Sequence, residues 1–453
     1  MRPWIVGLVV AAVTGAGFAL VWGWAIGMQS YNLWGALLVT PVFVAVNAVL
    51  LWRAASREPS PWFGKLIGLA FLAKMLGTLA RYYVAYVVYD GASDAERYNL
   101  AAASLYQSWR EGNVTWDLQN ARGTQYMELI TTAIYTVIGP TTVAAFFVYA
   151  AFAFWGAYLL YRAVRIALPD GDHRRYALLI FFLPSMLYWP SSIGKESWLM
   201  LFVGVSALGA AKFFAHQRGA LALLATGAFG TAIIRPHIAV LLFAGLIVAQ
   251  LFRPASTRAT GILNKAAALV VMGAAVWILA TQSVELLGTD DITFQSVTQS
   301  IETAGGRTTQ GGSEFTPVPV DSPLAFPAAA FTILFRPLPW EAGNAQLLIQ
   351  SLEGMLLLGL TLASWPRLRR LPSTMRRNPF VVFCVIYTIS FIVAFSAFAN
   401  FGILARQRVL MLPFFLVLLA LPAPPRPKDY TEDEWDDLTS RVAPAGVRRR
   451  GGG

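Results

Sequence analysis

Sulfur and imidazole ligands are scarce in this chain. The 453 residues include one cysteine and three histidines. Cys384 lies inside an apolar run, which argues against a disulfide and against a thiolate metal site. The three histidines are scattered along the sequence, so a metal site built on imidazole groups is not expected either.

Charge is also scarce. Only 13% of the residues are charged, whereas a soluble protein carries about 25%. Hydrophobic residues make up 57% of the chain, and the mean hydropathy is +0.56. These values argue against a water-soluble fold. The net charge of +11 does not indicate nucleic-acid binding, because the Lys and Arg residues lie in short loops between apolar runs.

Long apolar runs recur instead, and about twenty such residues can cross a bilayer as a helix. We predict an all-α, polytopic integral membrane protein with about twelve transmembrane helices. Several runs are only about 16 residues long, which suggests thin or re-entrant helices around a cavity. The expected spans are roughly 4–25, 32–52, 66–88, 143–162, 176–193, 197–212, 219–234, 238–252, 262–281, 343–363, 379–398 and 403–422.

The first run could be a secretory signal, but it is long for one. No clear cleavage site leads from it into a polar segment, so we interpret 4–25 as the first membrane span. Residues 1–422 then form one transmembrane domain. The remaining segment, 423–453, is Pro-rich, then acidic, then basic, with too few apolar residues for a core, and is expected to be a disordered cytoplasmic tail.

Loop charge predicts the orientation. Alternate loops beginning at 53–65 hold seventeen Lys and Arg residues, and the opposite loops hold nine. Because the richer side is usually cytoplasmic, both termini are expected inside a bacterial cytoplasmic membrane. The long loops 89–142 and 282–342 then lie outside.

The two long outer loops differ in pattern. In 89–142, Tyr98, Ala102, Leu105 and Trp109 recur at helical spacing, which predicts an amphipathic helix on the membrane surface. Residues 126–139 form a second, less polar segment that fits the interface. In the other loop, 282–328 is rich in Gly, Thr, Ser and Gln without periodicity, so a mobile lid and a disordered loop both remain open.

Five groups of polar residues interrupt the apolar chain, all on the outer side. Charge near the hydrocarbon core is costly and is therefore often functional. Together they suggest an active site at a membrane surface. The candidate residues are Asp90, Asp94, Glu96 and Arg97; Lys195 and Glu196; Arg235 and His237; Arg336 and Glu341; and Arg406 and Arg408.

The carboxylates and the cations suit different tasks. Asp94 or Asp90 could act as a general base or could hold a divalent cation, Mg²⁺ or Mn²⁺. The plain alternative is a solvated loop. The arginines could bind phosphate, with headgroup contacts as their alternative. Lys195 and Glu196 could equally form an ion pair at a helix start.

Three more charges lie deeper in the apolar runs. Lys74 and Arg81 are seven residues apart and share one helical face, and Glu353 lies within the tenth expected span. We expect each to face protein or a cavity, and for Lys74 and Glu353 we favour an ion pair that fixes helix packing. We count Arg81 among the candidate phosphate ligands. Carboxylates and cations beside hydrocarbon fit a substrate with an anionic head and a lipid tail, such as a lipid-linked sugar phosphate.

The segment Asp94-Ala-Glu96-Arg97-Tyr98 resembles the first outer loop of GT-C glycosyltransferases, which are polytopic enzymes that use polyprenyl-phosphate sugars. Gly123-Thr-Gln-Tyr126 and Leu183 to Glu196 are similar to later stretches of such proteins, so the likeness covers roughly 65–215. It implies an inverting glycosyltransferase for cell-envelope glycans. Its base or metal-associated carboxylate would be Asp94, with Asp90 as second choice.

The sequence departs from that family in two ways. Two extra spans precede the loop, and no large soluble C-terminal domain follows. Arg336 to Glu341 and Arg406 to Arg408 are also similar to polysaccharide polymerases of the Wzy type. Single-sugar transfer and polymerisation therefore both stay open. A transporter or flippase of lipid-linked glycans and a non-catalytic scaffold are the alternatives from other classes.

Overall fold

Helices make up most of the part of the chain that the structure describes. The computed structural model describes residues 3–114, 123–253 and 313–423, with short helical pieces at 265–266, 269–270 and 272–274. Within these residues every regular element is a helix, and Glu314 and Asn400 form an isolated β-bridge. The all-α prediction is confirmed. Most of the expected span 262–281, residues 282–312 of the second long loop and the tail from 424 lie outside the described residues.

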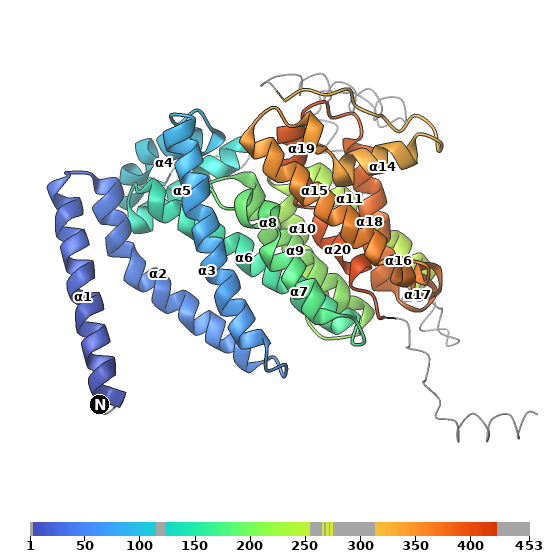
Figure 1. Cartoon of the computed structure of the whole chain (residues 1–453), viewed down its shortest axis with the longest axis horizontal. Coiled ribbons are helices and arrows are strands. Elements are labelled where there is room, and N and C mark those ends of the chain that lie inside the picture. Colours follow the sequence, from blue (N-terminus) through green and yellow to red (C-terminus); the bar gives the residue numbers. More distant parts are fainter. Residues whose placement is uncertain are drawn as a thin grey trace, which may run out of the picture.

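The N-terminal helices stand at one side of the molecule, and α1 lies outermost (Figure 1). Large apolar side chains of α2 and α3, among them Val42, Leu72 and Leu76, are exposed, as expected of helices that face hydrocarbon. A short π-helix, η1, extends α3 toward the next loop. The bounds are α1 Pro3–Gly27, α2 Tyr31–Ser56, α3 Phe63–Tyr83 and η1 Val84–Val88.

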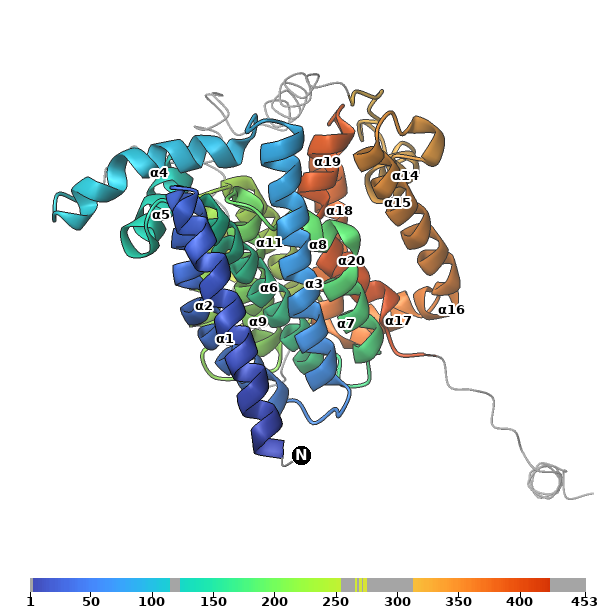
Figure 2. The ribbon, with the colours of Figure 1, turned by 60° about the vertical axis from the view of Figure 1, so that its left-hand side comes forward.

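The loop after α3 forms two helices that pack against each other, α4 (Asp94–Arg110) and α5 (Thr124–Ile138). Tyr98, Ala102 and Trp109, which recur at helical spacing, are buried on one face of α4. Figure 2 shows α4 lying across one end of the bundle, near α5. We refer to this end as the α4 end.

The centre of the molecule is a helical bundle in which α6 packs closely along α9, with both helices running in the same direction. Glycines allow this approach. A Cβ atom on Gly156 would lie 2.3 Å from the Met200 carbonyl oxygen, and one on Gly204 would lie 2.3 Å from the Gly156 carbonyl oxygen. The bounds are α6 Thr142–Ala167, α7 His173–Phe182, α8 Pro184–Tyr188, α9 Lys195–Phe214, α10 Ala220–Ala232 and α11 Pro236–Phe252.

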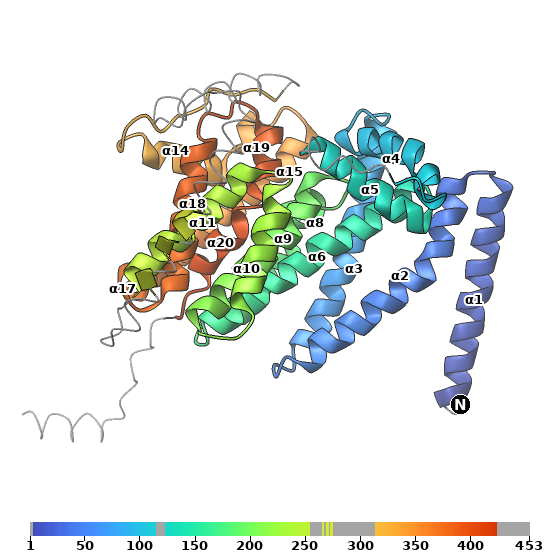
Figure 3. The same ribbon diagram turned by 180° about the vertical axis from the view of Figure 1, so that it is seen from behind.

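The C-terminal helices complete the bundle, with α18 packed along α11, as the rear view in Figure 3 shows. Residues 313–320 run over the end of α18 and the start of α19, and Phe315 stacks on Phe401. The bounds are α14 Phe326–Phe335, η2 Pro339–Glu341, α15 Ala345–Ala363, α16 Trp365–Leu368, α17 Leu371–Arg377, α18 Pro379–Phe395, α19 Phe401–Arg408 and α20 Leu412–Leu419.

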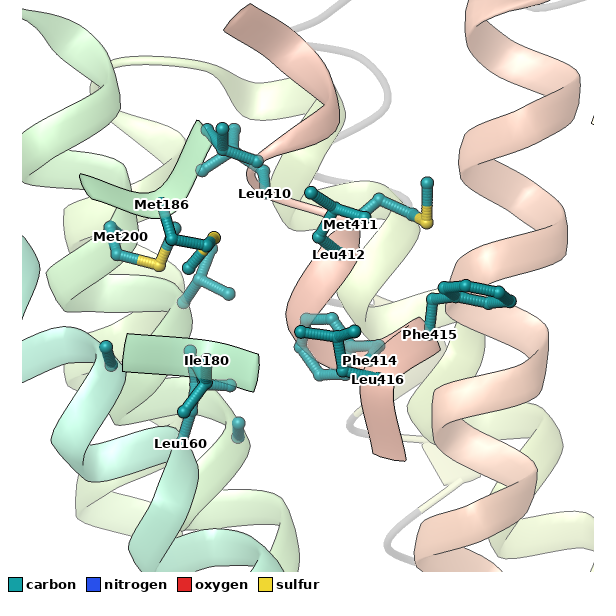
Figure 4. Close-up of a cluster of buried hydrophobic side chains, with 14 of the residues drawn as sticks. Leu160, Ile180, Met186, Met200, Leu410, Met411, Leu412, Phe414, Phe415 and Leu416 are labelled. Carbon is teal, nitrogen blue, oxygen red and sulfur yellow. The ribbon is translucent and has the colours of Figure 1, made fainter. Parts of the chain in front are cut away.

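The core lies where α20 meets α7, α8 and α9. Met186 lies beside Met200, and Leu410 and Leu412 lie on the segment opposite them, where the Met411 side chain points away (Figure 4). All five side chains are buried. This apolar centre holds the helices that carry the polar groups in a fixed arrangement.

Two expected spans are not single helices. The run 176–193 breaks between α7 and α8 because Pro184 lacks an N–H and disfavours a helical Leu183. The run 403–422 is bent by 64° between α19 and α20. Among the described residues, five helices are long and apolar enough to cross a membrane, or six if α19 and α20 form one span.

Candidate functional site at the α4 end

Four charged residues from separate parts of the chain meet at the α4 end. Glu196 Oε1 accepts hydrogen bonds from Arg235 Nη2 at 2.9 Å and from Arg406 Nε at 2.8 Å. Arg406 Nη1 donates to Asp94 Oδ2 at 2.6 Å. We name Asp94, Glu196, Arg235 and Arg406 the carboxylate–arginine cluster. Arg235 also donates to the side-chain oxygen of Gln407.

Local structure places each member at a helix end. Asp94 and Glu196 lie in the first turns of α4 and α9, where the helix dipole favours negative charge. Pro236 starts α11 directly after Arg235. Arg406 lies in α19, whose start is capped by Asn400 through a 3.1 Å bond from the Ile403 N–H.

Exposure increases along the cluster. The side chain of Glu196 is 4% exposed, that of Arg235 12%, that of Arg406 25% and that of Asp94 54%. The cluster is therefore closed at Glu196 and open to the surroundings at Asp94. A ligand can reach Asp94 and the edge of Arg406 without any helix moving.

Lys195 lies beside the cluster. Its Nζ donates to Thr124 Oγ1 at 2.9 Å, which links the start of α9 to the start of α5. It also interacts electrostatically with Arg235, Glu196 and Asp94. Counting Lys195, three cations face two carboxylates, so the site carries one net positive charge.

Tyr98 is a neighbour that the sequence did not mark as part of the site. It lies one turn after Asp94 in α4 and is buried. Burial, together with the negative charges of Asp94 and Glu196, raises the pKa of Tyr98 to about 12, against the opposing effect of Arg406 and Arg235. Its hydroxyl therefore stays protonated at neutral pH. Its helical spacing marked it as a buried residue, and only the fold shows that it lies near the charged groups of the cluster.

The other expected phosphate ligands have different neighbours. Arg336 bonds Glu341 and lies over the rings of Phe315 and Phe401. Hydrogen bonds from Arg336 and from the Leu338 N–H hold the pKa of Glu341 below its usual value, although burial acts in the opposite direction. Arg336 thus contacts Glu341 and two aromatic rings instead of a member of the cluster.

Arg408 and Arg81 contact protein groups as well. Arg408 is fully buried, and its Nη1 donates to the carbonyl oxygens of Leu334 and Arg336 at 3.1 Å each. Arg81 donates to the Tyr188 hydroxyl at 3.0 Å and lies over the rings of Tyr188 and Trp189. The structure brings neither into hydrogen-bond contact with the cluster.

The remaining candidates lie around the site. Glu96 accepts hydrogen bonds from Tyr86 and Asn99, and Arg97 pairs with Glu128 at 3.2 Å. His237 is exposed, and its ring lies 6.2 Å from that of Phe395. Asp90 occupies the turn before α4 with a φ of 47°. Among the described residues, no three His, Cys, Asp or Glu side chains gather in a way that could hold a metal ion.

The deep charges Lys74 and Glu353 bond backbone and hydroxyl groups, whereas we expected an ion pair between helices. Lys74 Nζ donates to the Met186 carbonyl oxygen at 2.8 Å. Glu353 accepts from the Ser185 N–H at 2.6 Å and from the Ser185 hydroxyl at 2.5 Å. Since Lys74 and Arg81 both contact the segment 186–189, their expected placement on one face of α3 is confirmed.

Comparisons of the chain with family models, with curated proteins and with solved structures found no match. The function therefore has to be argued from the geometry of the cluster and from its position at one end of an apolar helical bundle.

Proposed function

We propose that this protein is a membrane glycosyltransferase that moves a sugar from a polyprenyl-phosphate donor to a cell-envelope glycan or lipid-linked acceptor. The cluster of Asp94, Glu196, Arg235 and Arg406 is its active site. The observation that carries the proposal is the exposure of Asp94, the open end of a cluster whose other members are held by one another.

In this scheme Asp94 is the general base. An acceptor hydroxyl attacks the anomeric carbon of the donor sugar, and its proton passes to an Asp94 carboxylate oxygen. The new carbon–oxygen bond forms as the bond between the anomeric carbon and the phosphate oxygen breaks. Polyprenyl phosphate leaves with the bonding electrons, and attack from the opposite face inverts the anomeric centre.

The cations stabilise the leaving phosphate. Arg406 is the bridging residue, because it bonds both Asp94 and Glu196 and is partly exposed. As the donor arrives, one guanidinium hydrogen bond moves from Asp94 to a phosphate oxygen, which leaves Asp94 free to accept a proton. Arg235 and Lys195 add positive charge behind it. Arg336 and Arg408 have no part in this step.

The same proposal includes the membrane topology. The bundle crosses the bacterial cytoplasmic membrane about twelve times, with both termini in the cytoplasm and the α4 end outside. Support comes from the five to six apolar helices of sufficient length and from the loop charges. Figure 1 supports it too, since α4, α14 and α19 lie toward one end of the bundle and α16, α17 and the N-terminus toward the other.

The buried charges favour an enzyme over a transporter. A transport path needs polar groups available along the depth of the bundle. Lys74 and Glu353 are instead bound to Met186 and Ser185 of the protein itself. The exposed charge of the cluster lies at the α4 end.

The test is transfer by the purified protein in lipid nanodiscs, with a panel of polyprenyl-phosphate sugars and release of polyprenyl phosphate as the readout. We expect release with at least one donor, reduced by about 100-fold or more in Asp94→Asn. Asp170→Asn is the matched control, because Asp170 is an exposed carboxylate in the turn between α6 and α7. Equal activity of the Asp94 variant and wild type would refute the mechanism.

A further inference from the structure

The end of the bundle opposite the cluster carries a group of exposed arginines on α16 and α17 (Figure 1). These two short helices turn the chain from α15 back into α18. Leu368, Leu371 and Met375 of this segment are partly buried against the hydrophobic core, so the segment is fixed to the bundle. The exposed arginines, which we name the outer arginines, are Arg369, Arg370, Arg376 and Arg377.

The outer arginines have no counterion in the part of the chain that the structure describes. None of them lies within ion-pair distance of a described carboxylate. Arg369 lies over the ring of Trp365, 5.6 Å from its centre. The neighbouring Arg367 differs, because it is less exposed and its Nη2 pairs with Asp172 Oδ2 at 2.9 Å.

The arrangement of α17 presents these charges together. Leu371 and Met375 are one helical turn apart on its inner side, whereas Arg376 and Arg377 share the exposed side with Ser373. Like charges this close repel one another, since they lie within the Debye length of about 10 Å at 0.1 M salt. An anionic partner would relieve this repulsion, and the surface is accessible to one.

The C-terminal chain leaves the bundle beside this surface. Arg367 Nη1 donates to the Leu421 carbonyl oxygen at 2.6 Å, and the Asp172 N–H donates to the Ala420 carbonyl oxygen at 2.9 Å. Figures 1 and 2 show the end of the described chain, at Ala423, close to α17. The sequence that follows residue 423 therefore starts next to the outer arginines.

That sequence contains a concentrated block of negative charge. Residues 429–437 hold six of the 24 Asp and Glu residues of the protein, and they include no Lys or Arg. Six positions separate Ala423 from Asp429, and an extended chain of that length covers about 20 Å. Since α17 has seven residues and is about 10 Å long, the acidic block can reach all of it.

We propose that the acidic segment 429–437 of this same chain binds the outer arginines through ion pairs. Six negative charges then face four positive ones. Exposed ion pairs are individually weak, so binding depends on several forming together and on the short tether, which keeps the local concentration of the segment high. Trp435, within the segment, can lie over a guanidinium as Trp365 lies over Arg369.

Anionic lipid headgroups are the competing partner, because arginines at a membrane surface attract them too. The acidic segment is favoured by its attachment, since it begins beside the outer arginines and does not have to be recruited from solution or from the bilayer. Its binding also depends on neither glycosyl transfer nor the number of membrane spans.

The test is disulfide formation in the purified full-length protein in detergent, with Ser373→Cys on α17 and Thr431→Cys in the acidic segment. Cys384 is buried and should not compete. The matched control keeps both cysteines and the tail length but removes the charge of the segment, by Asp429→Asn, Glu432→Gln, Asp433→Asn, Glu434→Gln, Asp436→Asn and Asp437→Asn. We expect the disulfide to form about five- to tenfold faster with the acidic segment than with the neutral one, and the difference to disappear in 1 M salt, where the Debye length is about 3 Å.

Charge reversal identifies the arginines involved. Adding Arg376→Glu and Arg377→Glu to the double-cysteine protein should slow the disulfide to the rate of the neutral control or below it. Further addition of Asp436→Lys and Asp437→Lys should restore at least part of the rate, because the opposite charges then face each other again. Failure of this rescue would overturn the pairing.

Three other results would overturn the proposal. Equal rates with the acidic and the neutral segment would show that reach alone brings the cysteines together. Disulfides that join two chains would assign the segment to a second copy. Loss of the disulfide in nanodiscs of phosphatidylglycerol, but not of phosphatidylcholine, would assign the outer arginines to lipid headgroups. The Asp94 assay is unaffected by all of these, so the two proposals fail separately.

Discussion

The charged groups of this protein fall into two regions that differ in their partners. In the interior, Lys74, Glu353 and Arg408 are buried and bind carbonyl, N–H or hydroxyl groups of adjacent helices. We call these three residues the interior anchors. In the carboxylate–arginine cluster the partners are other charged side chains and Gln407, and exposure reaches 54% at Asp94.

This difference distinguishes charged groups that stabilise the fold from charged groups that can bind a ligand. A backbone carbonyl cannot leave its helix, so an anchor such as Lys74 has a fixed partner. An ion pair between side chains can exchange one member for a ligand of the same charge, and Arg406 holds two carboxylates at once. The cluster can therefore exchange a carboxylate for a phosphate, which the anchors cannot do.

The largest effect is expected at Glu196, which is buried like the interior anchors and also belongs to the cluster. Glu196→Gln removes the carboxylate that two guanidiniums share, and it leaves buried Arg235 with neutral partners only, which should lower the free energy of unfolding by about 3 to 5 kcal/mol. Sugar transfer should also be lost. Denaturant unfolding in detergent micelles and the nanodisc assay measure the two effects. Unchanged stability would contradict the view that Glu196 is a buried partner of both arginines.

At Asp94 the expected effect falls on activity alone. Asp94→Asn should reduce transfer by about 100-fold or more, the contribution typical of a general base. Because the side chain is half exposed, loss of its ion pair with Arg406 should change stability by less than about 1 kcal/mol. A large loss of stability in this variant would show that Asp94 has a structural role like that of the interior anchors, and the proposed difference between the two regions would be wrong.

The interior anchors should show the opposite result. Glu353→Leu leaves the buried Ser185 N–H and hydroxyl without their acceptor and should destabilise the protein by about 1 to 3 kcal/mol. Transfer measured below the unfolding temperature should remain near wild type. Glu353→Gln, which keeps one acceptor oxygen, is the control and should lose less stability.

The smallest effect is expected at the pair of Arg336 and Glu341, which lies outside both regions. The folded protein holds the pKa of Glu341 below its unfolded value, so the carboxylate stabilises the fold above the unfolded pKa, about 4.3. That contribution disappears as the pH falls through the lower, folded pKa. Wild type should therefore melt slightly higher than Glu341→Gln at pH 7, and the two should converge in acid. A difference that persists in acid would exclude the carboxylate as its source.

Much of the fold follows from local patterns. Apolar runs long enough for a bilayer predicted the helices, and the spacing of Tyr98, Ala102 and Trp109 predicted α4. The break at Pro184 and the bend between α19 and α20 were missed, although Pro184 and Pro413 marked them. Apolar content alone does not distinguish one long helix from two short ones.

The site was only partly predictable. Asp94, Glu196, Arg235 and Arg406 were all candidates, but so were Arg336 and Arg408, which have partners elsewhere. Thr124 and Gln407 lay within segments singled out for their resemblance, but neither was a candidate site residue. Their partners appear only in the packed bundle.

Composition and helical periodicity by themselves determined that this chain is an apolar helical protein and that its charges collect between the apolar runs. Both properties depend on neighbours within about twenty residues, which is the range that a sequence pattern can report. Tertiary structure alone decided that Asp94 meets Arg406, 312 positions away, and that Arg408 does not join them. Such pairings depend on how closely the helices pack, as at Gly156 and Gly204, and spacing along the chain does not contain that information.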